Sequence, residues 1–325
     1  MPRVISADEM DRVLDFPGLR EALRLAFAGG MSAPERLHYG LGEATLLLMP
    51  AWTQGTPQPN AVMGTKIVSV FPGNGALGLP AVNGLYVLQS GHTGAPLAVL
   101  DGARLTQWRT AAASALAAQY LARAGAETLT MVGAGSLAPF LIRAHASVRP
   151  LRHVTIWNHN GARALQLAAQ MAGASYTVSV SDDLQAACAS ADIISCATLS
   201  REPLVRGEWL KPGTHLDLVG AFTPAMREVD DDTICRASVY LDTPAALTEG
   251  GDIAIAISKG VIQDKAVIGD LSGLCRGDCQ GRRDEDEITL FKSLGAAVED
   301  LAAAALVWQR MTPGIIPDAY AVEIR

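Results

Sequence analysis

A glycine-rich turn that directly follows a short apolar segment constrains the fold of this chain more than any other feature. Residues 128–132 are apolar or β-branched, and Gly133, Gly135 and the small Ala138 come directly after them. A helix-like segment and then a strand-like segment, residues 153–157, follow. This order of strand, glycine turn, helix and strand is typical of a Rossmann dinucleotide-binding unit, where the helix N-terminus receives the pyrophosphate. The turn therefore predicts a bound nucleotide cofactor.

Strand-like and helix-like segments alternate from residue 128 onward, which predicts a doubly wound parallel sheet. Between about residues 34 and 100, β-like runs are instead separated by turns rich in glycine and proline, which predicts a mostly antiparallel sheet. We therefore expect an α/β protein with a β-rich domain over residues 1–112 and 301–325, and a Rossmann domain over residues 113–300. The expected strands cover residues 45–49, 61–71, 83–89 and 96–100 in the first domain, and 128–132, 154–157, 176–180, 193–197, 216–219, 239–242 and 267–269 in the second.

Helical spacing of apolar residues predicts several helices. Residues 6–27 have this spacing, with an interruption near Pro17. An alanine-rich helix is expected over residues 111–124, with Thr110 as its N-cap. Two further segments are expected: a long helix over about residues 287–308, and a terminal extension over residues 313–325 that returns to the first domain.

The composition excludes several classes of partner. The net charge of −7 and the pI near 5.4 disfavour nucleic acid and anionic membranes. No uninterrupted apolar run is long enough to span a bilayer, and the first residues lack the apolar core of a signal peptide. The five cysteines are scattered, and no set of cysteines and histidines has metal-ligand spacing. We therefore expect a cytoplasmic protein with reduced thiols, no metal site, and no nucleic-acid or membrane partner.

Lys66 lies at an unusual position for a charged residue. In the run 61–71 it shares one face of the expected strand with apolar residues and glycine, and the run contains no acidic residue to pair with it. Arg109 directly precedes Thr110 and the expected alanine helix, so its guanidinium would lie near free helix N–H groups. Arg36 could add a third positive group. Each residue alone fits an ordinary surface position or ion pair, but together they predict a receptor for a small anionic substrate.

The residues that follow the second expected strand of the Rossmann unit, residues 153–157, bear on the choice of cofactor. NAD-specific sites usually place an acidic residue here, about 20 residues beyond the glycines, to bind the ribose 2′-hydroxyl. This chain has the neutral Asn158, followed by His159, and Arg163 lies one helical turn further on. These residues favour a 2′-phosphate and hence NADPH. The alternative stays open that the acidic residue was replaced without a change in cofactor preference, in which case the protein uses NADH.

Several motifs resemble those of the ornithine cyclodeaminase/mu-crystallin family. They occur in the expected order at residues 66–74, 109–114, 132–135, 219–228 and 287–300. The resemblance implies a homodimer in which the β-rich domain, joined by the C-terminal tail, serves dimerisation and substrate binding, while the Rossmann domain binds a nicotinamide cofactor. It also implies residue roles: Arg36, Lys66 and Arg109 bind the substrate carboxylate; Gly133, Gly135, Ser136 and Leu137 cradle the pyrophosphate; Thr110 is a further cofactor contact; Asn158 faces the adenosine ribose; and Ala197 and Thr198 lie beside the nicotinamide ribose.

Membership of this family leaves the reaction open, because it includes cyclodeaminases, amino-acid dehydrogenases and cyclic ketimine reductases. Cyclodeaminases with a similar motif carry an aspartate where this chain has Phe222. Phenylalanine can neither bind an ammonium group by charge nor transfer a proton, but it suits a substrate that is already a ring. The alternative is that an acid arrives from elsewhere, for instance Asp217 or Glu228.

We therefore expect NAD(P)H-dependent reduction of a cyclic ketimino acid by hydride transfer to C2. The candidates are Δ1-pyrroline-2-carboxylate, giving L-proline, and Δ1-piperideine-2-carboxylate, giving L-pipecolate. Ring size, pathway and proton donor stay open, with His38 as one candidate relay. Two alternatives are an ornithine cyclodeaminase that uses NAD+ catalytically, and an NADPH-dependent small-ligand binding protein of the mu-crystallin type.

Overall fold

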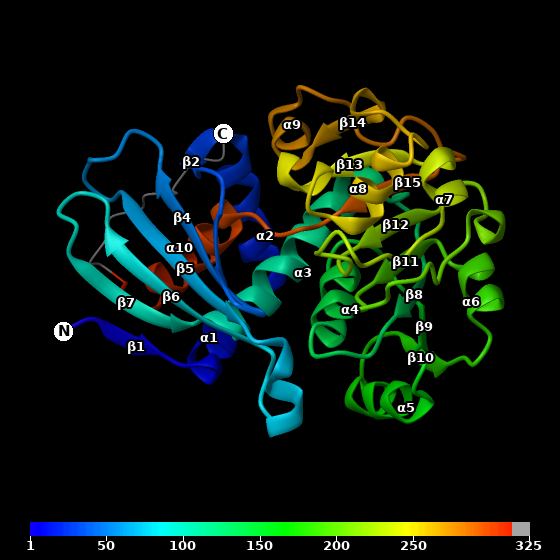
Figure 1. Ribbon diagram of the computed structural model, residues 1–325, viewed down its shortest axis with the longest axis horizontal. Coiled ribbons are helices and arrows are strands. Elements are labelled where there is room, and N and C mark those ends of the chain that lie inside the picture. Colours follow the sequence, from blue (N-terminus) through cyan, green and yellow to red (C-terminus); the bar gives the residue numbers. More distant parts are fainter. Residues whose placement is uncertain (314–325) are drawn as a thin grey trace. The chain divides into compact units, whose positions relative to one another are not determined.

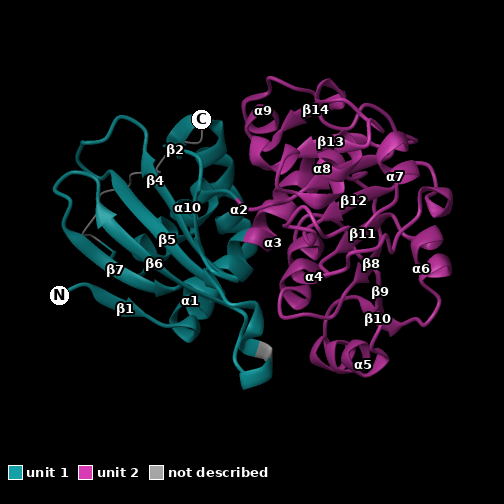
Figure 2. Ribbon diagram, viewed as in Figure 1, with its two compact units in different colours: residues 1–109, 296–325 teal, residues 110–295 magenta. Residues whose placement is uncertain are grey.

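The computed structural model describes residues 1–313 and divides into two compact units (Figure 2). Unit 1 comprises residues 1–109 and the chain from residue 296 onward, and unit 2 comprises residues 110–295. The two predicted domain boundaries, after residues 112 and 300, lie three and five residues beyond the boundaries between the units, which fall after residues 109 and 295. The expected terminal extension lies, apart from Pro313, outside the described residues. Within residues 1–313, no helix has both the length and the apolar character needed to cross a bilayer.

Unit 1 contains a seven-stranded, mostly antiparallel sheet (Figure 1). Its four long strands pair in sequence order, and β1 adds a parallel edge. The antiparallel sheet that the glycine- and proline-rich turns predicted is therefore confirmed. Its strands are β1 (Arg3–Ile5), β2 (Met31–Ser32), β3 (Leu37–Leu41), β4 (Ala44–Thr53), β5 (Val62–Val70), β6 (Val82–Ser90) and β7 (Pro96–Asp101).

Helices cover one face of this sheet. Helix α10 (Ala297–Met311) packs on β4, β5 and β6, and α2 (Phe16–Leu25) packs on α10. The first helical segment is interrupted, but earlier than expected: α1 (Ala7–Val13) ends before Leu14, α2 begins at Phe16, and Pro17 lies in the first turn of α2 and not at the break. Asp15 caps α2 by accepting a hydrogen bond from Gly18 N at 2.7 Å. A π-helical turn (Ala26–Gly30) follows α2, and a 3-10 turn (Pro72–Leu77) follows β5.

Unit 2 is a doubly wound parallel sheet of eight strands in the order β10-β9-β8-β11-β12-β15-β13-β14 (Figure 1). The strand order reverses between β8 and β11, and dinucleotides bind at such a switch point, beyond the carboxyl ends of the strands. The strands are β8 (Thr128–Val132), β9 (His153–Trp157), β10 (Thr177–Val180), β11 (Ile193–Cys196), β12 (His215–Leu218), β13 (Ser238–Leu241), β14 (Val267–Asp270) and β15 (Thr289–Lys292).

The central strands β8, β11, β12, β13 and β15 are almost wholly buried, as expected for a parallel sheet with helices on both faces. The helices that connect the strands are short. They are α4 (Ala138–Ala146), α5 (Gly161–Gln170), α6 (Leu184–Ser190), α7 (Asp231–Arg236), α8 (Gly251–Ser258) and α9 (Leu271–Arg276), with 3-10 turns at Gly207–Trp209, Pro244–Leu247 and Asp264–Ala266.

The prediction of one long helix over residues 287–308 was wrong, because the segment contains two elements. Residues 289–292 form the strand β15, which is fully buried between β12 and β13, and they are not part of a helix. Gly295 has a φ of +90°, and Asp242 Oδ2 accepts a hydrogen bond from Leu294 N at 2.7 Å. The chain therefore turns after β15, and α10 begins only at Ala297.

The predicted start of the alanine-rich helix was also wrong. Helix α3 spans Gly102–Leu121, so it begins nine residues before Ala111, and Thr110 lies inside it and is not an N-cap. Asp101 Oδ1 accepts a hydrogen bond from Arg104 N at 2.9 Å and caps the helix. A Cβ at position 102 would lie 2.6 Å from the Gly84 carbonyl carbon, so glycine allows the helix to begin against β6.

Candidate active site

The glycine turn after β8 has the geometry of a pyrophosphate site. Gly133 has a φ of +112°, and a Cβ there would lie 2.6 Å from Ala197 O, so only glycine fits. At Gly135 a Cβ would meet no atom within 4 Å, so the space beside the turn is open. Helix α4 begins just beyond, and its first N–H groups donate to backbone carbonyls of the turn: Ala138 N to Gly135 O (3.1 Å), and Phe140 N and Leu141 N to Leu137 O (3.0 and 3.1 Å). A bound anion would therefore lie against the turn itself, at the positive end of the helix dipole.

Ser136 and Leu137, both predicted to contact the pyrophosphate, form the turn between Gly135 and α4. Open space beside the turn, a helix that begins directly after it and backbone that only glycine can provide are features that a dinucleotide needs at this position. The residues present therefore fit a nicotinamide dinucleotide.

Three predicted cofactor residues lie at and after the end of β9. Asn158 Oδ1 accepts from Ala134 N (3.2 Å) and its Nδ2 donates to Asn160 O (2.9 Å), so this side chain ties the end of β9 to the glycine turn. His159 and Arg163 are exposed, and Arg163 lies in the first turn of α5. The strand thus ends in a neutral amide, which would not repel a 2′-phosphate.

The other predicted residues of unit 2 follow the central strands. Ala197 and Thr198 come directly after β11, and Thr198 N and Oγ1 both donate to Glu228 Oε1, at 2.7 and 2.8 Å. Phe222 follows β12, and its side chain is 41% exposed. These residues therefore lie at the carboxyl ends of strands, where ligands bind in this fold.

The two acids considered as replacements for the missing aspartate are both fully buried. Asp217 Oδ2 accepts from Ser195 Oγ (2.7 Å) and lies 3.0 Å from His145 Nε2. Glu228 is bonded to Thr198. Neither carboxylate is exposed beside Phe222, so the alternative of a compensating acid from these two positions has no structural support.

In unit 1, Lys66 is buried on the face of β5 that the strand alternation predicted. Its Nζ lies 3.0 and 2.9 Å from the two carboxylate oxygens of Asp300 on α10. Burial, together with the nearby charge of Arg109, lowers the pKa of Lys66 from 10.5 to about 8. The ammonium is therefore paired, but by a residue distant in sequence.

Arg109 joins the same cluster, although not in the way predicted. It lies inside α3, so the free N–H groups of the helix start are not beside it. Arg109 Nε donates to Asp300 Oδ1 (2.9 Å) and Nη1 donates to Glu299 Oε2 (2.7 Å). Two cations thus face two carboxylates, and the formal charges of this buried cluster cancel.

Arg36 and Thr110 complete the predicted set. Arg36 precedes β3, and extending the β3 register by one residue places it opposite Met49, which pairs with Lys66. Arg36 is therefore on the face of the sheet that carries Lys66. Thr110 is buried in α3, next to Arg109 in the chain.

Sequence reasoning missed the acidic half of the cluster. Glu299 and Asp300 close the motif at residues 287–300, which was expected to lie within one long helix over about residues 287–308 and to belong to the Rossmann domain. Two adjacent acids, flanked by apolar residues on both sides, were the available signal, because charged residues are rarely fully buried unless paired. The structure places both at 0% exposure.

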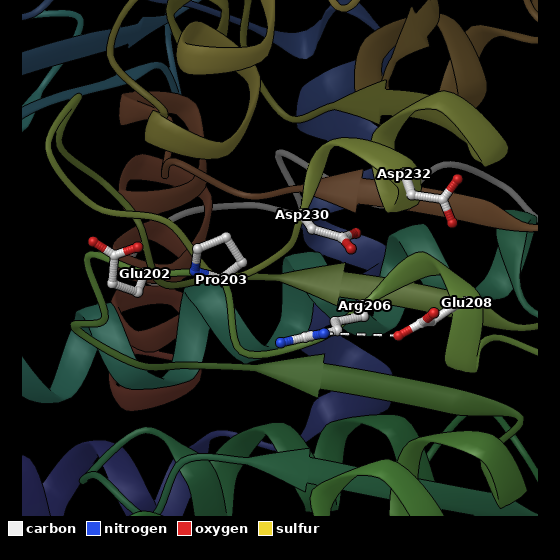
Figure 3. A pocket seen from close by; sticks show the side chains of 6 residues that line it. All are labelled: Glu202, Pro203, Arg206, Glu208, Asp230 and Asp232. Carbon is white, nitrogen blue, oxygen red and sulfur yellow. Dashed lines mark ion pairs between the residues drawn. The ribbon is translucent and has the colours of Figure 1, made fainter.

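A surface pocket in unit 2 has none of the predicted residues in its lining (Figure 3). Four carboxylates dominate it, so it disfavours phosphates and substrate carboxylates. No group of side chains within residues 1–313 has a metal-binding arrangement. The pocket lining is Glu202, Pro203, Arg206, Glu208, Asp230 and Asp232, with Arg206 paired to Glu208 at 3.8 Å.

The parallel sheet, its switch point and the glycine turn define a Rossmann-type dinucleotide-binding protein with an additional antiparallel unit. A sequence model of the ornithine cyclodeaminase/mu-crystallin family matches residues 4–314. The chain belongs to this family.

Individual relatives are similar over nearly their whole length. Protein SAR DEFICIENT 4 of Arabidopsis thaliana is 41% identical over 316 residues, covering 94% of this chain and 97% of that protein. Δ1-pyrroline-2-carboxylate reductase of Colwellia psychrerythraea is 35% identical over 319 residues, covering 95% and 99%. Among solved structures, Δ1-pyrroline-2-carboxylate reductase of Thermococcus litoralis in complex with NADH and L-proline has a TM-score of 0.89 at 30% identity, covering 95% of this chain and 97% of that one.

Proposed function

We propose that this protein is an NAD(P)H-dependent reductase of cyclic ketimino acids, which converts Δ1-pyrroline-2-carboxylate to L-proline, Δ1-piperideine-2-carboxylate to L-pipecolate, or both. Similarity to reductases of the first compound supports an oxidoreductase that acts on C=N bonds with a nicotinamide cofactor. The observation that carries the choice of reaction is the exposed Phe222 after β12. An apolar ring there suits a cyclic substrate and cannot assist ring closure of ornithine.

The residues of unit 2 would hold the cofactor, with Gly133, Gly135, Ser136 and Leu137 at the pyrophosphate. The bound cofactor supplies the hydride, and the protein contributes position and electrostatics. Asn158, His159 and Arg163 favour NADPH by charge, whereas the Thermococcus litoralis relative was solved with NADH. We propose NADPH as the preferred cofactor, and Asn158→Asp should shift the preference toward NADH.

Lys66 and Arg109, with Arg36, would bind the substrate carboxylate. Because the Lys66 cluster has no net formal charge, a carboxylate alone would compete with Glu299 and Asp300. A protonated cyclic iminium carboxylate carries both charges and adds no net charge to the cluster. The cluster therefore favours the iminium form as the substrate that reacts.

The exposed face of the unit 1 sheet supports a homodimer. Leu37, Ile67 and Leu85 lie in one cross-strand row, and each is more than a third exposed. Tyr39 and Leu41 extend this apolar face along β3. Monomers rarely leave such a continuous apolar face in water, so we propose that a second copy of the chain covers it.

A paired assay tests the reaction. One arm follows oxidation of NADPH and NADH with each cyclic imine at mildly acidic and neutral pH, and the other measures ammonia released from ornithine with NAD+. Imine-dependent oxidation without ammonia release is expected. Ammonia release would instead identify a cyclodeaminase, and cofactor binding without either reaction would identify a binding protein.

A further inference from the structure

Three charged side chains that the proposed mechanism does not use meet inside unit 2. Glu228 lies in the segment between β12 and α7, Asp252 lies in the first turn of α8, and Lys292 is the last residue of β15. All three are 0% exposed. Buried charges are costly unless they are paired and hydrogen-bonded, so their contacts indicate what they hold in place.

The contacts converge on the chain just beyond β11 and β12. Glu228 Oε1 accepts from Thr198 N (2.7 Å) and from Thr198 Oγ1 (2.8 Å). Lys292 Nζ donates to the carbonyl oxygens of Leu218 (3.3 Å) and Gly220. Glu228 therefore fixes Thr198, just beyond β11, and Lys292 fixes the last residue of β12 and Gly220 beyond it.

Asp252 fixes the two other members of the cluster. Its Oδ1 accepts from Glu228 N (2.7 Å) and Val229 N (3.1 Å), and its Oδ2 lies 3.5 Å from Lys292 Nζ. The backbone of Glu228 is therefore held independently of its side chain. The Glu228 side chain therefore extends to Thr198 from a backbone position that Asp252 holds.

The chain that this cluster fixes lies beside the glycine turn and beside one half of the proposed cofactor site. Ala197, the neighbour of Thr198, is the residue against which Gly133 packs. In a doubly wound sheet the two halves of a dinucleotide lie on opposite sides of the switch point, here between β8 and β11. The adenosine half follows β8 and β9, so the nicotinamide half lies on the side of β11 and β12, whose ends the cluster fixes.

We propose that Glu228 is a positioning residue for the nicotinamide half of the cofactor: through its two hydrogen bonds to Thr198 it fixes the chain after β11, while Asp252 and Lys292 hold it in place. The proposal rests on the cofactor assignment in the proposed function, but not on the identity of the imine. Glu228 touches neither cofactor nor substrate in this account.

The electrostatics of the cluster point to a suitable conservative variant. Burial, and next the charge of Asp252, raise the pKa of Glu228 to about 7. Glu228 Oε2 accepts no hydrogen bond from the described residues, so the positioning depends on Oε1 alone. Glu228→Gln keeps an acceptor oxygen at that place and should preserve the two bonds to Thr198.

The test compares the whole cofactor with its adenosine half. Dissociation constants of NADPH and of adenosine 2′,5′-bisphosphate, which lacks both the nicotinamide and its ribose, are measured by calorimetry for the wild type, Glu228→Ala and Glu228→Gln. We expect Glu228→Ala to weaken NADPH about tenfold, since two hydrogen bonds are lost, and to leave the fragment within about twofold. Glu228→Gln should bind both ligands within about threefold of the wild type.

Two further variants keep the result interpretable. Glu228→Asp, which shortens the reach to Thr198, is measured in parallel with the same expectation in case Glu228→Ala does not fold. Asp192→Asn is the matched control, because the Asp192 carboxylate also accepts two hydrogen bonds, here from Glu127 N (2.9 Å) and Thr128 N (3.0 Å), but it precedes β11 at the amino-terminal end of that strand, so the change should affect neither constant.

Equal weakening of NADPH and of the fragment would overturn the proposal, since it indicates a general structural role. Unchanged NADPH binding in Glu228→Ala and Glu228→Asp would also overturn it. A wild-type protein that binds NADPH but reduces no cyclic imine would refute the proposed function and leave this binding comparison intact.

Discussion

The buried ammonium of Lys66 gives the stability of this protein a specific dependence on pH. The pKa of Lys66 is about 8 in the folded chain and about 10.5 when it is exposed in the unfolded chain. Between these values the unfolded state binds more protons, so the free energy of unfolding rises with pH. The full difference corresponds to about 3 kcal/mol, of which about 2 kcal/mol falls between about pH 7.5 and pH 9.5.

Lys66→Met removes this titration and leaves a side chain of similar length in the same place. Urea unfolding of the wild type and of Lys66→Met, followed by circular dichroism across this pH range, gives the difference in free energy of unfolding at each pH. Taking the difference cancels the titrations that both proteins share, including those of unit 2. We expect the wild type to gain about 2 kcal/mol relative to Lys66→Met as the pH rises.

Lys265→Met is the matched control, because it makes the same substitution at an exposed lysine. A difference between the wild type and Lys66→Met that stays constant within about 0.5 kcal/mol would refute the lowered pKa of Lys66, since an ammonium with an ordinary pKa gives that result.

Three other variants test the site and the assembly. Gly135→Val should fold with an unchanged melting temperature and lose most NADPH affinity, because a Cβ there meets open space in the protein but would fill the pyrophosphate position; retained affinity would move the cofactor elsewhere. Phe222→Asp should lower kcat/KM for the cyclic imine and produce no ammonia from ornithine, and a faster imine reduction would show that the apolar wall is unimportant. Leu85→Glu should convert the proposed dimer to a monomer in light scattering, because it places a charge in the exposed apolar face, and a dimer mass that does not change would put the interface on another surface.

The long strands β4 to β7 and most strands of the parallel sheet could be predicted from the sequence because their signals are local, whereas the short edge strands β1, β2 and β3 were not expected. Alternation within residues 61–71 and the glycine turn after β8 each depend on neighbours in the chain. β15 was missed for the opposite reason. Its four residues are buried on both faces, so it has no polar alternation, and it is close in the chain to a true helix.

In the buried cluster of unit 1, the two cations could be singled out from the sequence but the two acids could not. Lys66 stood out because no partner occurred nearby, and its partner Asp300 lies 234 residues away, where only the fold brings it close. The start of α3 depends on the close approach of Gly102 to Gly84 on β6, which likewise has no local signal. The positions of Arg109 and Thr110 inside the helix could not be derived before that contact was known.

Transfer of deuterium from cofactor to product tests the central claim most directly. Each cyclic imine is incubated with the protein and NADPH that carries deuterium at the transferable C4 position, and the amino-acid product is analysed by mass spectrometry and NMR. Hydride transfer to C2 predicts proline or pipecolate with one deuterium at C2. A product without deuterium at C2, or no product from either imine, would contradict it.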